Sequence, residues 1–267
     1  MRRVGGVLVA LVGCAMIVPF LYMIATGFMG EFEVLRYPPP LLPARLHPEN
    51  FASALTALPF GRFFLNSAIF SVGVVAGQVA TSATAAYAFA RLRFPGRDRV
   101  FVAYLSVLMV PAVVLLIPRF LIINALGWVD TYAGLISTEL VSVWGIFLLR
   151  QFFLTIPRDL EDAARLDGAG EWTVFWRVVL PLSKPALATL AVFAFVDQWK
   201  SFLWPLIATR STDMQVVEVG IANFHGQYYT NWPYQMAAVV TAVLPLLVLY
   251  FVAQKYFIRG IQLTGLK

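Results

Sequence analysis

Residues 155–185 read TIPRDLEDAARLDGAGEWTVFWRVVLPLSKP and separate two long apolar stretches of the chain. Pro157 suits the first turn of a helix, and the helix dipole favours the acidic residues that follow it. Gly168 is expected to end this helix, because glycine enters the left-handed cap conformation without steric cost. A second short helix is predicted over about 171–179. The segment therefore predicts a helix–turn–helix hairpin.

The first of these helices carries a narrow stripe of small apolar side chains, since Leu160, Ala163 and Ala164 follow at i, i+3 and i+4. Glu161 precedes Arg165 by four residues, the favourable order for an ion pair on a helix. Such a helix would let the surface of a partner protein approach closely. The alternative is an amphipathic segment among lipid headgroups, which the aromatic residues of the second helix support: Trp172, Phe175 and Trp176. These residues alone leave both interpretations open.

The rest of the chain has the composition of a membrane protein. Of its 267 residues 60% are hydrophobic and only 13% are charged, and the mean hydropathy is +0.77. A water-soluble core of this size could not bury so much apolar surface. We predict an all-α, polytopic membrane protein that forms one transmembrane domain over residues 1–267. Its six helices are expected at about 6–28, 64–89, 100–123, 131–153, 185–208 and 236–258.

The net charge of +6 is distributed as membrane topology requires, not as a nucleic-acid-binding surface. With a cytoplasmic N-terminus, six spans return the C-terminus to the cytoplasm and place most basic residues inside. Six basic residues remain outside: Arg36, Arg45, Arg62, Arg119, Lys200 and Arg210. The apolar run after Arg2 and Arg3 is too long for a signal peptide, so we expect the first helix to be retained.

Sequence motifs for catalysis and for metal binding are missing from this chain. No G-x-x-x-x-G-K-[ST] occurs, so the chain is not itself predicted to be an ATPase, and no H-E-x-x-H occurs either. His47 and His225 lie outside the predicted spans without metal-ligand spacing. Cys14 is the single cysteine, so no disulfide framework exists. We expect no enzyme activity, no metal and no cofactor in this chain.

Ionisable and polar residues inside predicted spans are candidates for the translocation path, because burying a charge in lipid is costly. Asp197, Gln198, Trp199 and Glu139 are the residues that we single out. Asp197 and Lys200 could instead neutralise each other at i and i+3. Trp199 could equally anchor the helix at the membrane interface. Glu139 has no cation near it in the sequence, so we expect its partner on another helix or a water-filled cavity around it.

Two further segments are predicted to be external, and the first of them mostly extended. Residues 30–63 are rich in proline, with a short helix near 49–58 where Pro48 and the Asn50 side chain could help start the turn. Residues 209–235 carry aromatic side chains of the kind that anchor at membrane interfaces: Tyr228, Tyr229, Trp232 and Tyr234.

The run EDAARLDGA at 161–169, followed by Leu180-Pro181 and Pro185, resembles the EAA loop of binding-protein-dependent ABC importer permeases. The resemblance implies a coupling helix that sits in a cleft of a nucleotide-binding subunit. It assigns ATPase docking to eight residues: Glu161, Asp162, Ala163, Ala164, Arg165, Asp167, Gly168 and Ala169. Asp162 stands where the family usually has glutamate, which keeps the carboxylate and shortens its stem by one methylene.

The resemblance extends along nearly the whole chain, to the six-span subunit of maltose-type carbohydrate importers. Its further matches are PFGRFFLNS at 59–67, AYAFAR at 86–91, FPGR at 94–97, FLWPL at 202–206 and RGIQLTGLK at 259–267. It implies a multi-pass protein of the bacterial inner membrane that binds no cofactor itself. The implied partners are a second permease, two ATPase subunits that bind ATP and Mg²⁺, and an extracytoplasmic sugar-binding protein.

Two other functions compete with this one. An ion-coupled secondary transporter would use midplane ionisable groups such as Asp197 and Glu139, although no internal repeat is visible in the sequence. A membrane scaffold without transport activity would not require a docking hairpin. The sequence does not name the transported sugar.

Overall fold

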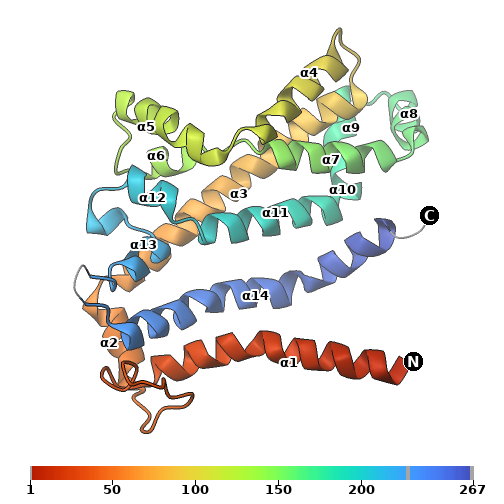
Figure 1. Cartoon of the computed structure of the whole chain (residues 1–267). Coiled ribbons are helices and arrows are strands. Elements are labelled where there is room, and N and C mark those ends of the chain that lie inside the picture. The colour runs from red at the N-terminus through yellow and green to blue at the C-terminus, as the bar shows by residue number, and fades with distance from the viewer. Residues whose placement is uncertain (1, 227–228, 265–267) are drawn as a thin grey trace. The chain divides into compact units, whose positions relative to one another are not determined.

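The computed structural model describes residues 2–226 and 229–264, with side chains described over 11–226 and 229–254. This part of the chain is helical and contains no strand, which confirms the all-α prediction (Figure 1). The longest helices are α1 (Arg2–Gly27), α3 (Phe60–Arg91), α11 (Lys184–Trp199) and α14 (Trp232–Thr264). The shorter ones are α2 (Glu49–Ala57), α4 (Arg97–Leu105), α5 (Leu116–Ala125), α6 (Tyr132–Ser137), α7 (Val143–Thr155), α8 (Arg158–Leu166), α9 (Glu171–Val174), α10 (Leu180–Leu182), α12 (Leu203–Ala208) and α13 (Val217–Ala222).

The chain divides into two compact units, Met1–Leu65 with Gln215–Leu247 and Asn66–Met214 with Val248–Lys267. The first unit holds α1, α2, α13 and the first parts of α3 and α14. Its core packs Phe60 and Phe63 of α3 against α13 and α14. Gly220 makes this close approach possible, because a β-carbon there would lie 2.2 Å from the Phe63 ring.

The short helix expected near 49–58 is present as α2 in the first unit. Our expectation for Asn50 was wrong. Its buried amide does not start the turn but donates hydrogen bonds of 3.0 and 2.9 Å to the carbonyls of Gly27 and Met29. Asn50 therefore fastens α2 to the end of α1, an interaction that no local pattern could reveal.

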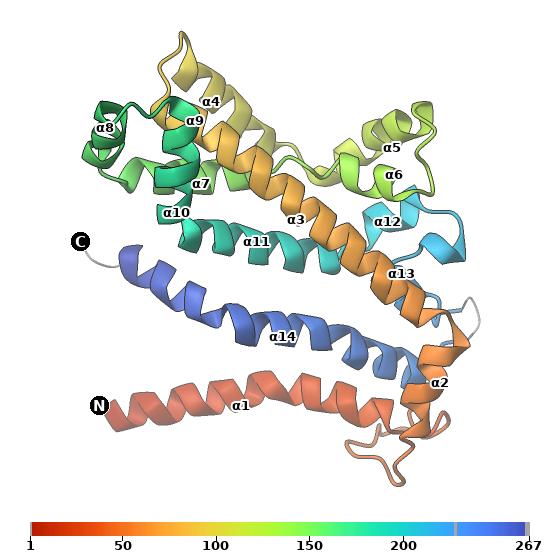
Figure 2. The same ribbon diagram turned by 180° about the vertical axis from the view of Figure 1, so that it is seen from behind.

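The second unit is built around one continuous apolar cluster that joins α3, α7, α11 and the hairpin. Its fully buried members include Leu149, Phe153, Val179 and Leu190. In both views of the molecule, α8 and α9 lie beyond one end of α11, and α5, α6 and α12 gather at the other end (Figures 1 and 2). The hairpin is thus part of the core of this unit and not an appendage.

Three of the predicted continuous spans are interrupted in the structure. The stretch 100–123 bends by 96° near Pro111, between α4 with its following 3₁₀ turn and the turn that leads into α5. The stretch 131–153 is divided into α6 and α7 by residues 138–142, and 185–208 into α11 and α12 by residues 200–202. The cause at Pro111 is local, because proline removes a backbone donor and crowds the preceding turn, which kinks or breaks a helix. The other two breaks coincide with Glu139 and Lys200, polar residues that favour water or protein over lipid.

By length and composition, two helical stretches among the described residues could each cross a membrane: Phe60–Arg91 and Trp232–Gln254. The number rises to four if each of two strongly bent helix pairs counts as one span. Leu11–Gly27 and Val143–Thr155 are apolar but shorter. The count of six spans therefore stays a prediction.

Candidate functional site

The predicted hairpin forms at 157–182, with helix α8 beginning after Pro157 and ending at Leu166. Gly168 adopts φ +85°, the left-handed conformation that the sequence pattern predicts for it. After Gly170 the chain enters α9, a π-helical turn over Phe175–Val179 and then α10. A sharp bend of 76° separates the helical stretch Glu171–Leu182 from α11.

A buried ion pair fastens α8 to the end of α3. Nε of Arg91 lies 2.6 Å from a carboxylate oxygen of Glu161, and both side chains are at most 3% exposed. The same guanidinium donates 2.7 Å hydrogen bonds to the carbonyls of Phe153 and Ile156. Both carbonyls lie where α7 ends; that of Phe153 also accepts a hydrogen bond from the Ile156 amide, and that of Ile156 lies just beyond the helix. Arg91 thus holds three helices together at the base of the hairpin.

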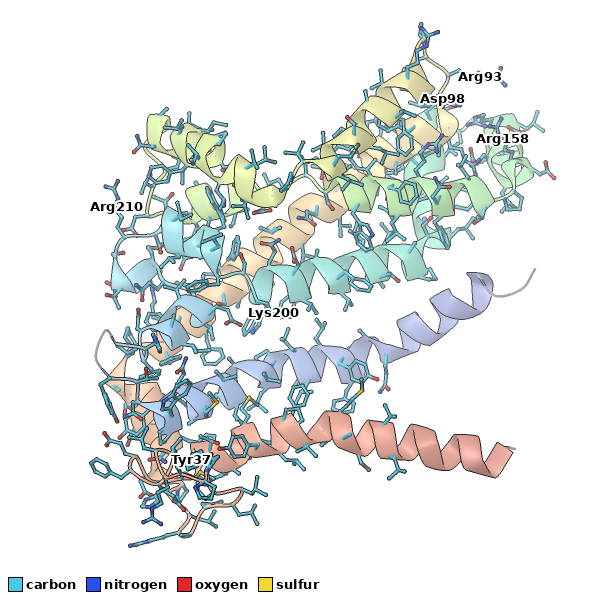
Figure 3. The ribbon with its side chains drawn as sticks, viewed as in Figure 1. Tyr37, Arg93, Asp98, Arg158, Lys200 and Arg210 are labelled. Carbon is cyan, nitrogen blue, oxygen red and sulfur yellow. The ribbon has the colours of Figure 1, made fainter. Side chains whose placement is uncertain are left out.

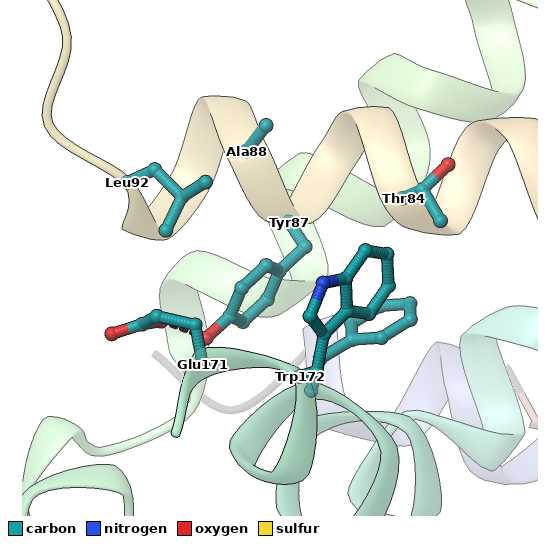
Figure 4. A pocket seen from close by; sticks show the side chains of 7 residues that line it. Thr84, Tyr87, Ala88, Leu92, Glu171 and Trp172 are labelled. Atoms are coloured by element: carbon teal, nitrogen blue, oxygen red, sulfur yellow. Dashed lines mark hydrogen bonds between the residues drawn. The ribbon is translucent and has the colours of Figure 1, made fainter.

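A second polar network links the two arms of the hairpin to α3. The Tyr87 hydroxyl donates a 2.6 Å hydrogen bond to Glu171 (Figure 4). Nε of Arg165 donates one of 3.1 Å to the same carboxylate. Arg165 also bonds Asp162 at 2.9 Å and approaches Glu161 to 3.5 Å, so the expected i, i+4 pair is present. The hydrogen bond from Tyr87, and then that from Arg165, lower the pKa of Glu171, which keeps it ionised.

The helix thereby has distinct inner and outer faces, and the eight predicted docking residues divide between them. Glu161 is buried, and Ala164 and Ala169 pack against the apolar cluster. The exposed residues are Asp162, Ala163, Arg165, Asp167 and Gly168. The Glu161 carboxylate pairs with Arg91 inside the chain, and the docking assignment of the eight residues stays a prediction.

Leu166, which the sequence argument passed over, is 90% exposed on the outer face of α8. Leu160, from the predicted stripe, is 47% exposed on the same helix. The spacing of these two leucines, at i and i+6, does not match a simple helical stripe, which is why the pattern did not single out Leu166.

The aromatic residues of the second arm lie together, as their spacing predicts. Phe175 is buried and makes edge-to-face contacts with Trp172 and Trp176, at centroid distances of 5.8 and 5.4 Å. Both tryptophans remain largely exposed. Trp172, Phe175, Tyr87 and Glu171 also line a small cavity of about 250 Å³ beside α3 (Figure 4).

A larger polar cavity of about 530 Å³ lies where the interrupted spans meet. It is lined from three of them, by Ala112 and Arg119, by Glu139, and by residues 193–201 around the break after α11. Arg119 forms an ion pair with Glu139. Its guanidinium lies 4.1 Å from the centre of the Trp204 ring, so it is held in place from two sides. The expectation that the partner of Glu139 comes from another helix is confirmed.

The cavity gathers three of the four residues that the sequence singled out for a translocation path. Glu139, Asp197 and Gln198 line it, whereas Trp199 is buried and stacks on Phe195 at 5.5 Å. The side-chain oxygen of Gln198 is buried without a hydrogen-bond partner in the described part of the chain. No ion pair joins Asp197 to Lys200 among the described residues, so the neutralised pair that we considered does not form.

Sequence reasoning missed Arg91 and Tyr87 at the hairpin and counted Arg119 among the external basic residues. Each acts through a partner that is distant in the sequence: Arg91 through Glu161, Tyr87 through Glu171, and Arg119 through Glu139. The only available signal was the position of Arg91 at the end of an apolar span, where basic residues are common for topological reasons.

Two further expectations concern segments that are only partly described. In the external segment 209–235, Tyr229 hydrogen-bonds Glu31, and Tyr228 lies outside the described residues. The matching C-terminal run extends to residue 267, and residues 265–267 also lie outside the described part. No group of three or more His, Cys, Asp or Glu residues in the described part could hold a metal ion.

Comparison with known proteins places this arrangement in a family. Residues 73–263 match the model of the family described as "binding-protein-dependent transport system inner membrane component". The chain is 34% identical to the arabinooligosaccharides transport system permease protein AraQ of Halalkalibacterium halodurans, over 93% of this chain and 90% of that one. It is 32% identical to the sn-glycerol-3-phosphate transport system permease protein UgpE of Rhizobium meliloti, over 97% and 95%.

The fold agrees with this relationship. A chain in the crystal structure of a bacterial ABC transporter that imports the acidic polysaccharide alginate superposes with a TM-score of 0.84, over 96% of both chains, at 24% sequence identity. The likeness extends through both compact units. With a family match over residues 73–263, this chain belongs to the inner-membrane components of binding-protein-dependent transport systems.

Proposed function

We propose that this chain is the permease subunit of an ATP-driven ABC importer for a sugar or sugar derivative. Relatives named for arabinooligosaccharides and for sn-glycerol-3-phosphate support that substrate class. The chain forms one six-span transmembrane domain over residues 1–267, with both termini in the cytoplasm. It works with a second permease, two ATPase subunits that carry ATP and Mg²⁺, and an extracytoplasmic binding protein. It catalyses no reaction itself.

The observation that carries this proposal is the outer face of α8. Two residues of α8, the apolar Leu166 and the small Ala163, are exposed. The ion pair of Arg91 and Glu161 fastens the same helix to the core. Force applied to α8 by an ATPase would pass through this buried pair to α3 and α7. Because the hairpin shares one apolar cluster with α11, its displacement would also move the helix that lines the polar cavity.

Docking is tested by removing the protruding apolar contact. Leu166→Asp should abolish co-purification of the ATPase subunits with the chain, while the chain still inserts into the membrane. Leu126→Asp is the matched control, because Leu126 is also an exposed leucine and lies in the link after α5, on the side predicted to be external. Wild-type recovery of the ATPase with Leu166→Asp would refute docking through this face.

We assign the polar cavity to the translocation path, with hydrogen bonds from the sugar hydroxyls to Gln198, Asp197 and Glu139. The side-chain oxygen of Gln198, which has no partner among the described residues, supports this role, since buried polar atoms normally have one. Gln198→Ala should lower uptake in vesicles and leave ATPase co-purification unchanged. Gln254→Ala removes a glutamine that lies outside this cavity and serves as the control. Uptake unaffected by Gln198→Ala would overturn the assignment.

The ion-coupled alternative predicts a different response. Uptake by an ATP-driven importer should continue when ionophores collapse proton and sodium gradients, as long as ATP is supplied. It should stop when ATP is withheld. Uptake by an ion-coupled transporter should stop when the gradients collapse. The family match favours the ATP-driven mechanism.

A further inference from the structure

A basic pocket lies between the loop that joins α3 to α4 and the start of α8. It encloses about 720 Å³ and is lined by four arginines, Arg93, Arg97, Arg99 and Arg158, with Phe94, Gly96 and Asp98. Two of these arginines come from positions 65 residues apart in the chain, at 93 and 158. Arg93, Asp98 and Arg158 lie at the same end of the structure, away from Lys200 (Figure 3).

The single acid of the pocket does not balance these charges. Asp98 accepts hydrogen bonds from Arg97 at 3.0 and 3.4 Å and lies 3.6 Å from Arg150. The hydrogen bond from Arg97 lowers the pKa of Asp98, so it stays ionised and bound to its own neighbours. Among the described residues, no acid forms an ion pair with the exposed Arg93, Arg99 or Arg158. Three guanidinium groups are therefore left to bind an anion.

The surface beside the pocket is apolar. Phe94 is 39% exposed at its edge, and Val100 and Val102 on α4 are 52% and 65% exposed. The pocket follows the end of α3, a helix apolar enough to cross the membrane. Cationic groups that border exposed apolar side chains at a membrane boundary match a molecule with a phosphate head and hydrocarbon tails.

The positive-inside rule accounts for basic residues near a span, but it does not require them to converge. Arg93 and Arg158 belong to different segments, and they face one concave space. Guanidinium groups bind phosphate oxygens in a bidentate manner, which gives geometric preference as well as charge. We propose that this pocket binds the phosphate headgroup of an anionic phospholipid, with the acyl chains along Val100 and Val102 of α4.

Lipid binding is tested on the purified full-length chain in detergent, by native mass spectrometry with added phosphatidylglycerol or phosphatidylcholine. Wild type should retain phosphatidylglycerol in preference to phosphatidylcholine. Each basic residue at an anionic surface contributes roughly a fivefold factor in affinity. The triple variant Arg93→Gln, Arg99→Gln, Arg158→Gln should therefore lose about 100-fold in phosphatidylglycerol affinity. Arg97 is left in place, because it also bonds the carbonyl of Leu92.

The matched control removes the same charge from exposed arginines in the segments predicted to be external, through Arg36→Gln, Arg45→Gln and Arg210→Gln. This control should keep the lipid preference of wild type. An equal loss in both triple variants would reduce the effect to net charge and overturn the proposal. Competition by inorganic phosphate at equal concentration would identify a free-anion site instead. Circular dichroism of each variant verifies that the helices are intact, and Val102→Asp, which leaves every arginine, should independently weaken lipid retention.

Discussion

Replacing Arg91 by alanine should be among the most damaging single changes in this protein. The substitution leaves the Glu161 carboxylate buried without its 2.6 Å partner and removes the hydrogen bonds to the Phe153 and Ile156 carbonyls. Breaking a buried ion pair from one side costs about 3–5 kcal/mol. Arg165 lies 3.5 Å from Glu161 and is partly exposed, so it compensates for part of the loss. We therefore expect about 3 kcal/mol.

The free energy of unfolding is measured by SDS titration of the purified chain in mixed micelles, followed by tryptophan fluorescence. Arg93→Ala is the matched control, because Arg93 is exposed and lies two residues after Arg91, just beyond α3. It should change the free energy of unfolding by no more than about 0.5 kcal/mol. The double variant Arg91→Met, Glu161→Leu removes both buried charges together. Its stability should return to within about 1 kcal/mol of wild type.

The same variants separate stability from coupling. If the buried pair transmits force, the double variant should fold and bind the ATPase, yet show ATP hydrolysis that is poorly linked to uptake. Equal stability of Arg91→Ala and Arg93→Ala would refute the reasoning about the pair. Normal uptake by the double variant would show that the ion pair stabilises the fold and does not transmit force.

Three further substitutions follow from backbone geometry and charge. Gly168→Val should lower the free energy of unfolding by about 1–2 kcal/mol and uncouple uptake from ATP hydrolysis, because φ is +85° at this position. The cost comes from the backbone alone, since no described atom lies within 4 Å of the added β-carbon. Uptake assays on Gly168→Asn, which tolerates this conformation, provide the comparison. Gly134→Ala should lower the thermal unfolding temperature, because its β-carbon would lie 2.2 Å from the Trp128 carbonyl oxygen, whereas Gly61→Ala meets nothing and should be neutral or stabilising. Glu171 has a pKa below its ordinary value of 4.5, so its contribution to stability is present above about pH 4.5 and is lost as the pH falls through the lowered pKa; Glu171→Gln should flatten the pH dependence of the unfolding free energy in that window.

The hairpin could be predicted from the sequence because its signals are local. Pro157 and Gly168 act through their own backbone torsions, and the residues between them are good helix formers. The aromatic cluster of the second arm likewise follows from helical spacing. Long-range partners leave no such mark. Nothing near Glu161 in the sequence indicates that an arginine 70 positions earlier would turn its carboxylate inward.

The interrupted spans show the same limit for the fold. A hydropathy window averages over about 20 residues, so a few non-helical positions inside an apolar stretch go unnoticed. Pro111 is a local signal for a break, whereas the break at 138–142 depends on a distant partner, Arg119, which pairs with Glu139. The polar residues were correctly identified as unusual. Their meeting in one cavity required the tertiary structure.

The broken helices also bear on how the protein enters the membrane. Helices α6 and α12 have six residues each, which is far short of the roughly 20 that a bilayer core demands. Neither could settle in lipid alone, because the backbone groups at its ends would face hydrocarbon. We therefore expect the segments around 111, 138 and 200 to enter the lipid together, once Arg119 can pair with Glu139. Biogenesis of this subunit is expected to be cooperative along the chain, and not one span at a time.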